Sequence, residues 1–196
     1  MPIMPVGERV ICRTPMWRAF AASIVGWSLS GETLSGEVLE IGGGSGAMGR
    51  GMLARFPDVR LTVADIDPLM VESVNKQLAR FGDRATAVVG DATDLPFADG
   101  TYEVVVSNLM LHHIGNWEDA VREAIRVTRP GGRFVGYDLA DSMRSRAFHH
   151  LDQIHDLRSV TEPAMAAVLR DAGVTDFTLR RGRTGLTLRW VAHKPW

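Results

Sequence analysis

Cysteine is nearly absent from this chain, which has a single one, Cys12, among its 196 residues. One cysteine cannot form an intrachain disulfide, so packing and hydrogen bonds must stabilise the fold. Proteins that keep their cysteines reduced are typical of the cytoplasm. The sequence therefore favours a cytoplasmic location.

An excess of charge of either sign is also missing. The 22 lysines and arginines balance 23 aspartates and glutamates, which gives a formal net charge of −1. Proteins that bind nucleic acid or anionic membranes usually carry a marked basic excess. The balance of charge therefore predicts no nucleic-acid partner and no membrane partner.

The sequence has no hydrophobic run long enough to cross a bilayer. Residues 19–29 are apolar and follow Arg9, Arg13 and Arg18, which imitates a signal peptide, but no clean small-x-small cleavage site accompanies them. The pair Thr14-Pro15 instead has the form of a helix start, with threonine as the cap. We therefore expect a helix over residues 16–29 that covers the domain.

What the chain does contain is a regular alternation of strand-like and helix-like segments. Short β-branched runs predict strands, and segments with apolar residues at helical spacing predict helices. The predicted strands are residues 37–41, 60–65, 85–91, 101–108 and 133–138, and the predicted helices are residues 46–56, 68–80 and 116–127. Asn116 and Asp119 approximate a capping box at the start of the last helix. This alternation predicts a parallel sheet with helices on both faces.

The pattern changes after residue 140. Helices are predicted over residues 142–157 and 161–173, followed by two alternating strands, 176–180 and 187–191. The predicted fold is a single α/β domain with a doubly wound, mostly parallel seven-stranded sheet and an antiparallel C-terminal strand. Its parts are a covering helix or lid (1–30), a cofactor-binding core (34–140), a substrate lid (142–160) and a C-terminal helix with a strand pair (161–196).

Residues 38–49, VLEIGGGSGAMG, predict a strand that enters a tight turn and then a helix. Glycine suits such a turn because it tolerates positive φ and lets a ligand approach the backbone. Residues 44–49 fit the G-x-G-x-x-G spacing of dinucleotide sites. An E-x-G-x-G-x-G turn that receives S-adenosylmethionine is matched equally well, by Glu40, Gly42, Gly44 and Gly46. The turn alone leaves both ligands open.

Polar side chains end the first four predicted strands, namely Glu40, Asp65, Asp91 and Asn108. Ligands of open parallel sheets bind beyond the carboxyl ends of the strands, so these side chains should surround the turn. Carboxylates would repel the pyrophosphate of a dinucleotide. The ammonium, ribose hydroxyls and adenine amine of S-adenosylmethionine can all donate hydrogen bonds to them. The strand ends therefore favour S-adenosylmethionine.

With these residues in place, the chain resembles the class I S-adenosylmethionine-dependent methyltransferases, in the group that includes ubiquinone and menaquinone C-methyltransferases. The resemblance covers residues 34–140, where the segments 95–97, 107–109 and 130–132 follow in the family's order. It implies that the turn lines the methionine end of the cofactor and that Asp65 holds the ribose hydroxyls. The implied cofactor-binding residues are Glu40, Gly42, Gly44, Gly46, Asp65, Ile66, Asp91, Ala92 and Asn108.

Few residues are candidates for the chemistry itself. The methyl group of S-adenosylmethionine is already electrophilic, so the protein mainly has to align the acceptor and exclude water. Candidate general bases are His112 and His113, just past the fourth strand, and Tyr137 at the end of the fifth. The resemblance implies a structural role for the two histidines. The histidines within residues 149–155 match no strong metal signature, so no metal is predicted.

The predicted function is transfer of a methyl group to a small organic acceptor by in-line displacement. Residues 107–110, Ser-Asn-Leu-Met, do not match the motif of enzymes that methylate amino groups of nucleic acids. Two alternatives stay open. One is a protein that binds the cofactor without turnover, as a sensor or partner subunit, and the other is an NAD(P)-dependent oxidoreductase. The sequence does not specify the acceptor, and a homodimer that completes the pocket is a further hypothesis.

Overall fold

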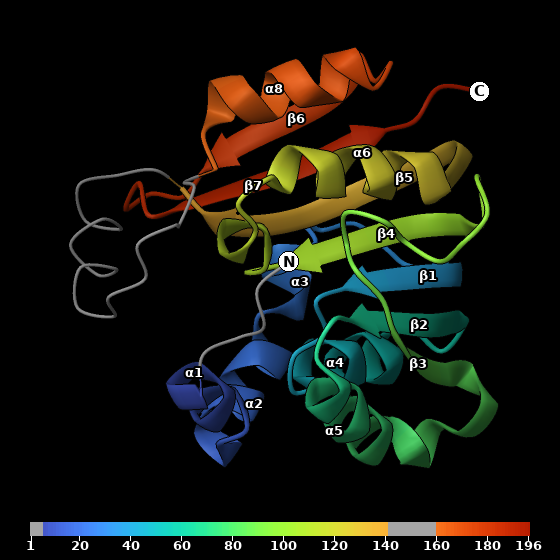
Figure 1. The fold of residues 1–196 in the computed structure, drawn as a ribbon, viewed down its shortest axis with the longest axis vertical. Coiled ribbons are helices and arrows are strands. Elements are labelled where there is room, and N and C mark those ends of the chain that lie inside the picture. Colours follow the sequence, from blue (N-terminus) through green and yellow to red (C-terminus); the bar gives the residue numbers. More distant parts are fainter. Residues whose placement is uncertain (1–5, 141–159) are drawn as a thin grey trace.

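The structure is a computed structural model that describes residues 6–140 and 160–196 (Figure 1). Its strands form one seven-stranded sheet in the order β3-β2-β1-β4-β5-β7-β6. Neighbours among β1 to β5 pair in parallel, and β7 pairs antiparallel with both β5 and β6. The strands are Gly36–Ile41 (β1), Val59–Asp65 (β2), Ala85–Val89 (β3), Tyr102–Asn108 (β4), Thr128–Leu139 (β5), Asp176–Arg181 (β6) and Thr187–His193 (β7). The predicted doubly wound, mostly parallel sheet is confirmed.

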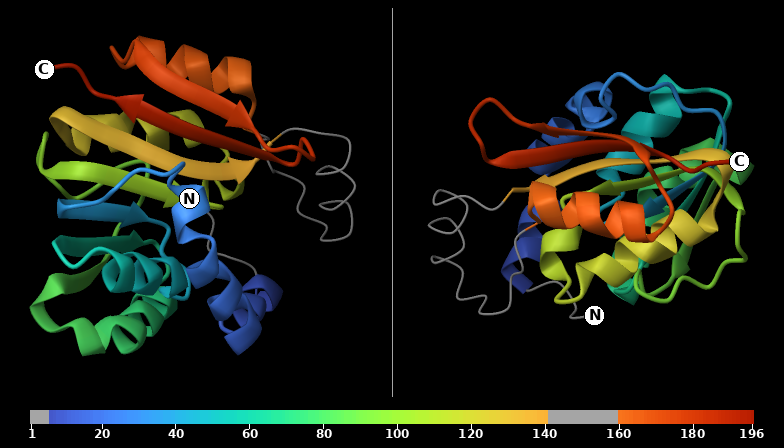
Figure 2. Two further views of the ribbon diagram at one scale, coloured as in Figure 1. Left: turned by 180° about the vertical axis from the view of Figure 1, so that it is seen from behind. Right: turned by 90° about the horizontal axis from the view of Figure 1, so that it is seen from above.

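Helices cover both faces of this sheet, as Figure 2 shows from above. One face carries α3 (Val25–Ser28), α4 (Ala47–Arg55) and α5 (Pro68–Leu78), with α1 (Val6–Cys12) and α2 (Pro15–Ser23) beside them. The other face carries α6 (Trp117–Val127) and α8 (Glu162–Asp171). Two 3₁₀ segments, η1 (Ala79–Arg84) and η2 (Leu111–His113), follow α5 and β4.

Successive strand residues point to opposite faces, which divides the core in two. Val38, Val106 and Val135 pack on the α3–α4–α5 face. Leu39 and Phe134, their neighbours in the chain, pack on the α6–α8 face. This alternation decides which strand-end side chains meet one another.

The N-terminal segment differs from its prediction. The helix expected over residues 16–29 is divided into α2 and α3, because Ile24 (φ −92°, ψ 2°) leaves the helical region. Thr14 caps α2 as predicted, accepting a hydrogen bond from the Trp17 amide. The short helix α1 was not predicted. In the described part of the chain, none of the helices has the length and apolar character needed to span a membrane.

Two strand boundaries and one helix cap also differ from their predictions. Strand β3 ends at Val89 and not at Asp91, whose carboxylate instead accepts hydrogen bonds from the Thr93 amide and hydroxyl. The capping box was wrong, because the Asn116 amide donates to the Asp119 side chain at 2.8 Å and makes no cap. Strand β5 begins at Thr128, earlier than predicted. The predicted helix at 142–157 and all but the last residue of the 142–160 lid lie outside the described residues.

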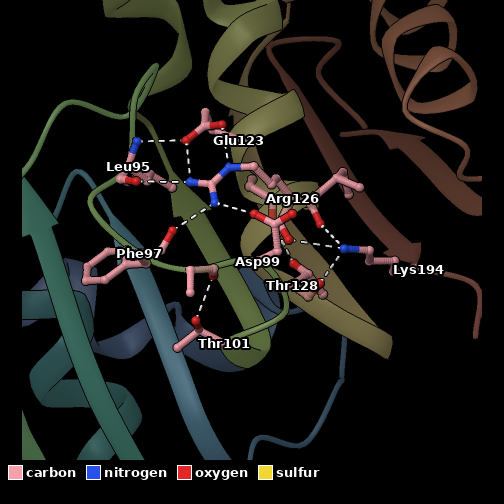
Figure 3. A network of polar contacts seen from close by, with 11 residues as sticks. Leu95, Phe97, Asp99, Thr101, Glu123, Arg126, Thr128 and Lys194 are labelled. Carbon is pink, nitrogen blue, oxygen red and sulfur yellow. Dashed lines mark hydrogen bonds and ion pairs between the residues drawn. The ribbon is translucent and has the colours of Figure 1, made fainter.

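Arg126 of α6 joins the helix to the loop that follows β3 (Figure 3). Its guanidinium contacts both carboxylate oxygens of Glu123 at 2.7 and 2.8 Å and the Asp99 carboxylate at 2.7 Å. It also donates to the carbonyls of Leu95 and Phe97. The two acids raise the pKa of Arg126 above its usual range. Arg126 thereby fixes the loop to the C-terminal end of α6, near the edge of the sheet where β4 and β5 begin.

Replacing this guanidinium should destabilise the domain. Arg126→Met removes a donor from two carbonyls and two carboxylates, of which Glu123 keeps only the Leu95 amide, so we expect the free energy of unfolding to fall by about 2–3 kcal/mol. Arg122→Met is the control, because Arg122 makes an exposed ion pair with Asp119 on the same helix and should cost less than about 1 kcal/mol. Urea titration measures both. Equal losses would contradict the importance assigned to the Arg126 network.

Candidate functional site

The glycine turn after β1 is held against the neighbouring strand. The Gly42 amide donates to the Ala64 carbonyl of β2, and the Gly46 amide donates back to Gly43, both at 2.8 Å. Gly42, Gly44 and Gly46 all have positive φ, at 72°, 51° and 79°. A side chain at any of them would be strained. The backbone conformation of the turn therefore favours glycine at all three positions.

The three glycines differ in what lies next to them. A Cβ on Gly42 would lie 2.1 Å from the Met110 Cγ, and one on Gly46 would lie 3.1 Å from the Val74 Cα of α5. A Cβ on Gly44 would meet nothing within 4 Å. Gly42 and Gly46 therefore serve close packing, whereas Gly44 faces open space where a ligand can approach the backbone.

This difference predicts different stabilities for two alanine variants. Gly44→Ala adds only the left-handed backbone penalty of about 1–2 kcal/mol. Gly42→Ala adds the same penalty and a clash with both Cβ and Cγ of Met110, so we expect its total loss to exceed that of Gly44→Ala by about 1–3 kcal/mol. Thermal unfolding of the two variants side by side measures the difference. A Gly44→Ala variant at least as unstable as Gly42→Ala would contradict the packing described here.

Asp65 at the end of β2 is tied to the glycine turn. Its carboxylate accepts hydrogen bonds from the Gly44 amide at 2.9 Å and the Asp67 amide at 3.0 Å. Burial raises the pKa of Asp65, and these amide donors oppose the rise. The Asp65 carbonyl also accepts from the Gly90 amide, which brings the end of β3 alongside. Each carboxylate oxygen keeps a further lone pair for a hydroxyl donor.

Glu40 at the end of β1 is almost fully buried, with 1% of its surface exposed. Its Oε2 has no hydrogen-bond partner among the described residues. Burial raises the pKa of Glu40 to about 8, the nearby Asp65 carboxylate adds to the rise, and the Gly49 amide opposes it. A buried, unpartnered carboxyl oxygen is costly, so a ligand that supplies a donor there would be stabilised.

A small cavity of about 70 Å³ opens beside the turn. Three of its polar lining residues, Glu40, Asn108 and Tyr137, belong to the adjacent strands β1, β4 and β5. Both side-chain atoms of buried Asn108 have no partner among the described residues. Burial raises the pKa of Tyr137 above its usual range, with added contributions from Asp138 and Glu40. Three polar groups of different character thus meet at one cavity.

The N-terminal helices form the opposite wall of this cavity, through Cys12, Trp17, Phe20 and Ala21. The sequence did not identify Cys12, because the short helix that carries it has no cap signal and its position depends on tertiary packing. The aromatic side chains make this wall apolar. Trp17 and Phe20 also contact each other, with ring centroids 5.7 Å apart.

His112 lies in a separate arrangement, with its Nδ1 2.5 Å from an oxygen of fully buried Asp138. The other Asp138 oxygen accepts from the Met110 and Leu111 amides at 3.0 and 2.7 Å. Burial opposes ionisation of Asp138, but His112 holds its pKa below the usual value. Asp138 follows Tyr137 and so points to the α6–α8 face. Neither His112 nor the adjacent His113 lines the cavity, and the histidine–aspartate pair instead anchors the loop after β4.

The remaining predicted residues do not line the cavity. Ile66 is half-buried and directly follows Asp65, while Ala92 is buried in the α6–α8 core. Asp91 is half-buried in the turn that follows β3. The site therefore has two ends, with Glu40, Asn108 and Tyr137 at one and Asp65, Ile66 and Asp91 at the other.

These two ends fit the chemistry of S-adenosylmethionine. The unpartnered Glu40 oxygen and the Asn108 amide can pair with an ammonium and a carboxylate, and the open space at Gly44 admits a ligand against the backbone. Asp65 and Asp91 can accept from ribose hydroxyls and an adenine amine. The Asp65 carboxylate beside the turn does not suit a pyrophosphate.

Comparison with known proteins agrees with this chemistry. A family model described as a methyltransferase domain matches residues 38–132. The ubiquinone/menaquinone biosynthesis C-methyltransferase of Cereibacter sphaeroides is 36% identical over 101 residues, which cover 50% of this chain and 40% of that protein. The sterol 4-C-methyltransferase of Caenorhabditis elegans is 32% identical over 126 residues, covering 58% and 36%. The chain thus spans about two fifths of the length of these curated relatives.

Solved structures share the fold over nearly the whole chain. The protein bound to the Trm112 methyltransferase activator in a Haloferax volcanii complex has a TM-score of 0.75 and 20% identity, covering 97% of this chain and 95% of that one. The [4+2]-cyclase SpnF has a TM-score of 0.68 and 17% identity, covering 93% and 83%. The motif order, the sheet topology and the family match together place residues 38–132 of the chain in the class I S-adenosylmethionine-dependent methyltransferases.

Proposed function

We propose that this protein transfers a methyl group from S-adenosylmethionine to a small organic acceptor. The proposal rests on one observation: the Glu40 Oε2 and the Asn108 side chain, which have no hydrogen-bond partner among the described residues, line the same cavity as the open backbone at Gly44. Fold alone would be insufficient, since a cyclase shares it. The curated relatives are named for ubiquinone and menaquinone biosynthesis or for sterol methylation, and the acceptor of this chain is a separate question.

The bound cofactor would supply a methyl carbon activated by a sulfonium. The residues that would hold it are Glu40 and Asn108 at the methionine end and Asp65 with Asp91 at the adenosine end. Gly44 would let the backbone approach closely, and its amide already fixes the Asp65 carboxylate at 2.9 Å. Holding both ends of the cofactor fixes the direction of in-line attack, which is where most of the rate enhancement would arise.

Residues of the cavity wall would position the acceptor. Trp17 and Phe20 present an apolar surface that excludes water from the methyl group. Tyr137 keeps its proton at neutral pH because burial raises its pKa, so it would donate a hydrogen bond and not act as a base. His112 is committed to Asp138 on the other face. These features favour acceptors that lose a proton readily, such as phenols or quinols, or that need no base, such as amines.

Cofactor binding without turnover is the main alternative, and its test is a turnover screen. Release of S-adenosylhomocysteine should be measured across phenol, quinol and amine libraries. Turnover with any acceptor class, lost in Asp65→Ala, would support the enzyme. Tight cofactor binding with no release across all three classes would favour a sensor or partner subunit.

Other properties of the whole protein are proposals of less weight. A cytoplasmic location rests on the single cysteine, and a homodimer rests on the small amount of chain left to cover the pocket. The N-terminal helices and the segment 142–160 are proposed as the substrate cover. An activator subunit is not part of the proposal, because 20% identity to a Trm112-bound protein shows the fold alone.

A further inference from the structure

A second, larger cavity of about 610 Å³ lies between α2–α3 and α4. Arg50 and Arg55 of α4 and Arg80 of η1 line it. Arg50 and Arg55 flank a strip of small residues, Gly51 and Ala54, on one face of α4. We call this cavity the arginine groove.

The arginine groove has positive charge without compensation. No acidic residue of the described chain lines it, and the described residues make no hydrogen bond or ion pair to the side chains of Arg50, Arg55 and Arg80. Arg80 stacks over the Phe81 ring at 5.0 Å, and the Arg55 guanidinium lies 3.6 Å from where a Cβ on Gly26 would be. Three cations in one cavity repel each other, and an anion would relieve that repulsion.

Helix geometry explains only part of this cluster. Arg55 is in the last turn of α4, where a cation is favourable to the helix dipole. Arg80 lies just past the C-terminus of α5, where a cation is also favourable, but Arg50 lies in the middle of α4 and gains nothing in this way. A neighbouring cavity of about 330 Å³ offers a contrast, because its Lys76 is paired with Glu72 at 2.6 Å. The arginine groove has no such internal partner.

The shape of the groove suits a ligand larger than a simple ion. Its other wall consists of Ala22, Ser23, Val25 and Gly26, which are small apart from Val25. Its volume lies within the range of small-molecule sites. Guanidinium groups bind phosphate oxygens in pairs, and three of them match a multiply charged group better than a single carboxylate.

We propose that the arginine groove binds a phosphate-bearing ligand. The same two helices serve both cavities, because α2 lines the glycine-turn cavity with Phe20 and Ala21 and the groove with the next two residues. In α4, Ala47 and Met48 line the first cavity, and Arg50 and Gly51 line the second. A ligand that bridges α2 and α4 would therefore fasten the N-terminal helices over the glycine turn.

Calorimetry at constant ionic strength tests the proposal, with inorganic pyrophosphate as the probe. We expect the wild type to bind it, and Arg50→Gln and Arg80→Gln each to raise Kd about tenfold or more. Arg60→Gln is the matched control, because Arg60 is exposed on β2 and does not line the groove. Melting temperatures without ligand show that the variants fold, and exposed Arg80 gives a readout even if Arg50→Gln does not fold.

Parallel titrations identify the source of the phosphate. Binding to phosphatidylglycerol vesicles, but not to pyrophosphate, would indicate a lipid headgroup, provided that both groove variants lose it. Binding to pyrophosphate alone would indicate a soluble ligand. The proposal is overturned if neither probe binds, if the groove variants bind as well as Arg60→Gln, or if citrate binds as tightly as pyrophosphate. These readouts do not depend on methyl transfer, so they can fail while the proposed function stands.

Discussion

The Asp65→Ala variant is expected to bind S-adenosylhomocysteine about tenfold to a hundredfold more weakly than the wild type, a loss of about 1.5–3 kcal/mol. Asp65 is buried at the end of β2, where its carboxylate can accept the ribose hydroxyls. It also accepts the Gly44 amide at 2.9 Å, so the variant loses a fixed point of the glycine turn as well as a ligand contact. Both losses act in the same direction.

A charge-matched variant separates this effect from a change in net charge. Asp58 is exposed in the turn before β2, and Asp58→Ala removes the same charge without touching the site. Calorimetry of both variants, with circular dichroism to verify folding, makes the comparison. A folded Asp65→Ala variant with unchanged affinity would remove Asp65 from the cofactor site.

The Glu40→Gln variant is expected to change how stability depends on pH. Because the pKa of Glu40 is about 8 in the folded protein and near 4.5 when unfolded, the folded state holds a proton between these values that the unfolded state has lost. Stability from this group is complete below pH 4.5 and is lost as pH rises through 8. Because of this difference in pKa, the free energy of unfolding should fall by on the order of 4 kcal/mol as the pH rises from 5 to 8.

Urea titrations at several pH values measure this effect as the difference between wild type and Glu40→Gln. The variant should lack the decline, and Glu37→Gln, an exposed change on the same strand, should keep it. Parallel pH profiles for wild type and Glu40→Gln would show that Glu40 titrates normally despite its burial.

The same proton should be linked to cofactor binding. An ammonium beside the Glu40 oxygen favours the ionised carboxylate, so binding at pH 7 should release a proton. The wild-type affinity for S-adenosylhomocysteine should then fall by up to about tenfold for each pH unit below 8. Calorimetry in buffers of different ionisation enthalpy detects the released proton, and its absence would separate Glu40 from the ammonium.

The sheet could be predicted in detail because local signals agreed with the global fold. The β-branched runs, the glycine turn at residues 42–46 and the acids at the strand ends all point to a parallel sheet with its site at one edge. The helix cap at Thr14 could be predicted equally well, because a side-chain oxygen followed by a proline is enough to identify a helix start. The predicted Asn116 cap is absent, because its side-chain oxygen accepts no backbone amide of α6 and its side-chain nitrogen instead donates to Asp119.

The site could be predicted only in part. The burial of a side chain, and the face of the sheet to which it points, depend on packing between distant segments. The sequence places Glu40 at a strand end but cannot show that its Oε2 is unpartnered. His112 and Tyr137 looked equivalent as bases, yet Asp138 binds His112 on one face while Tyr137 lines the cavity on the other. Cys12 reaches the cavity through the packing of the N-terminal helices, which has no local signature.

The central claim is that the glycine turn receives an adenosyl ligand and not a dinucleotide. Calorimetry of the full chain against S-adenosylmethionine, S-adenosylhomocysteine and NAD(H) tests it most directly. We expect both adenosyl ligands to bind with one site per chain and NAD(H) to show no binding. Binding of NAD(H) without either adenosyl ligand would contradict the account.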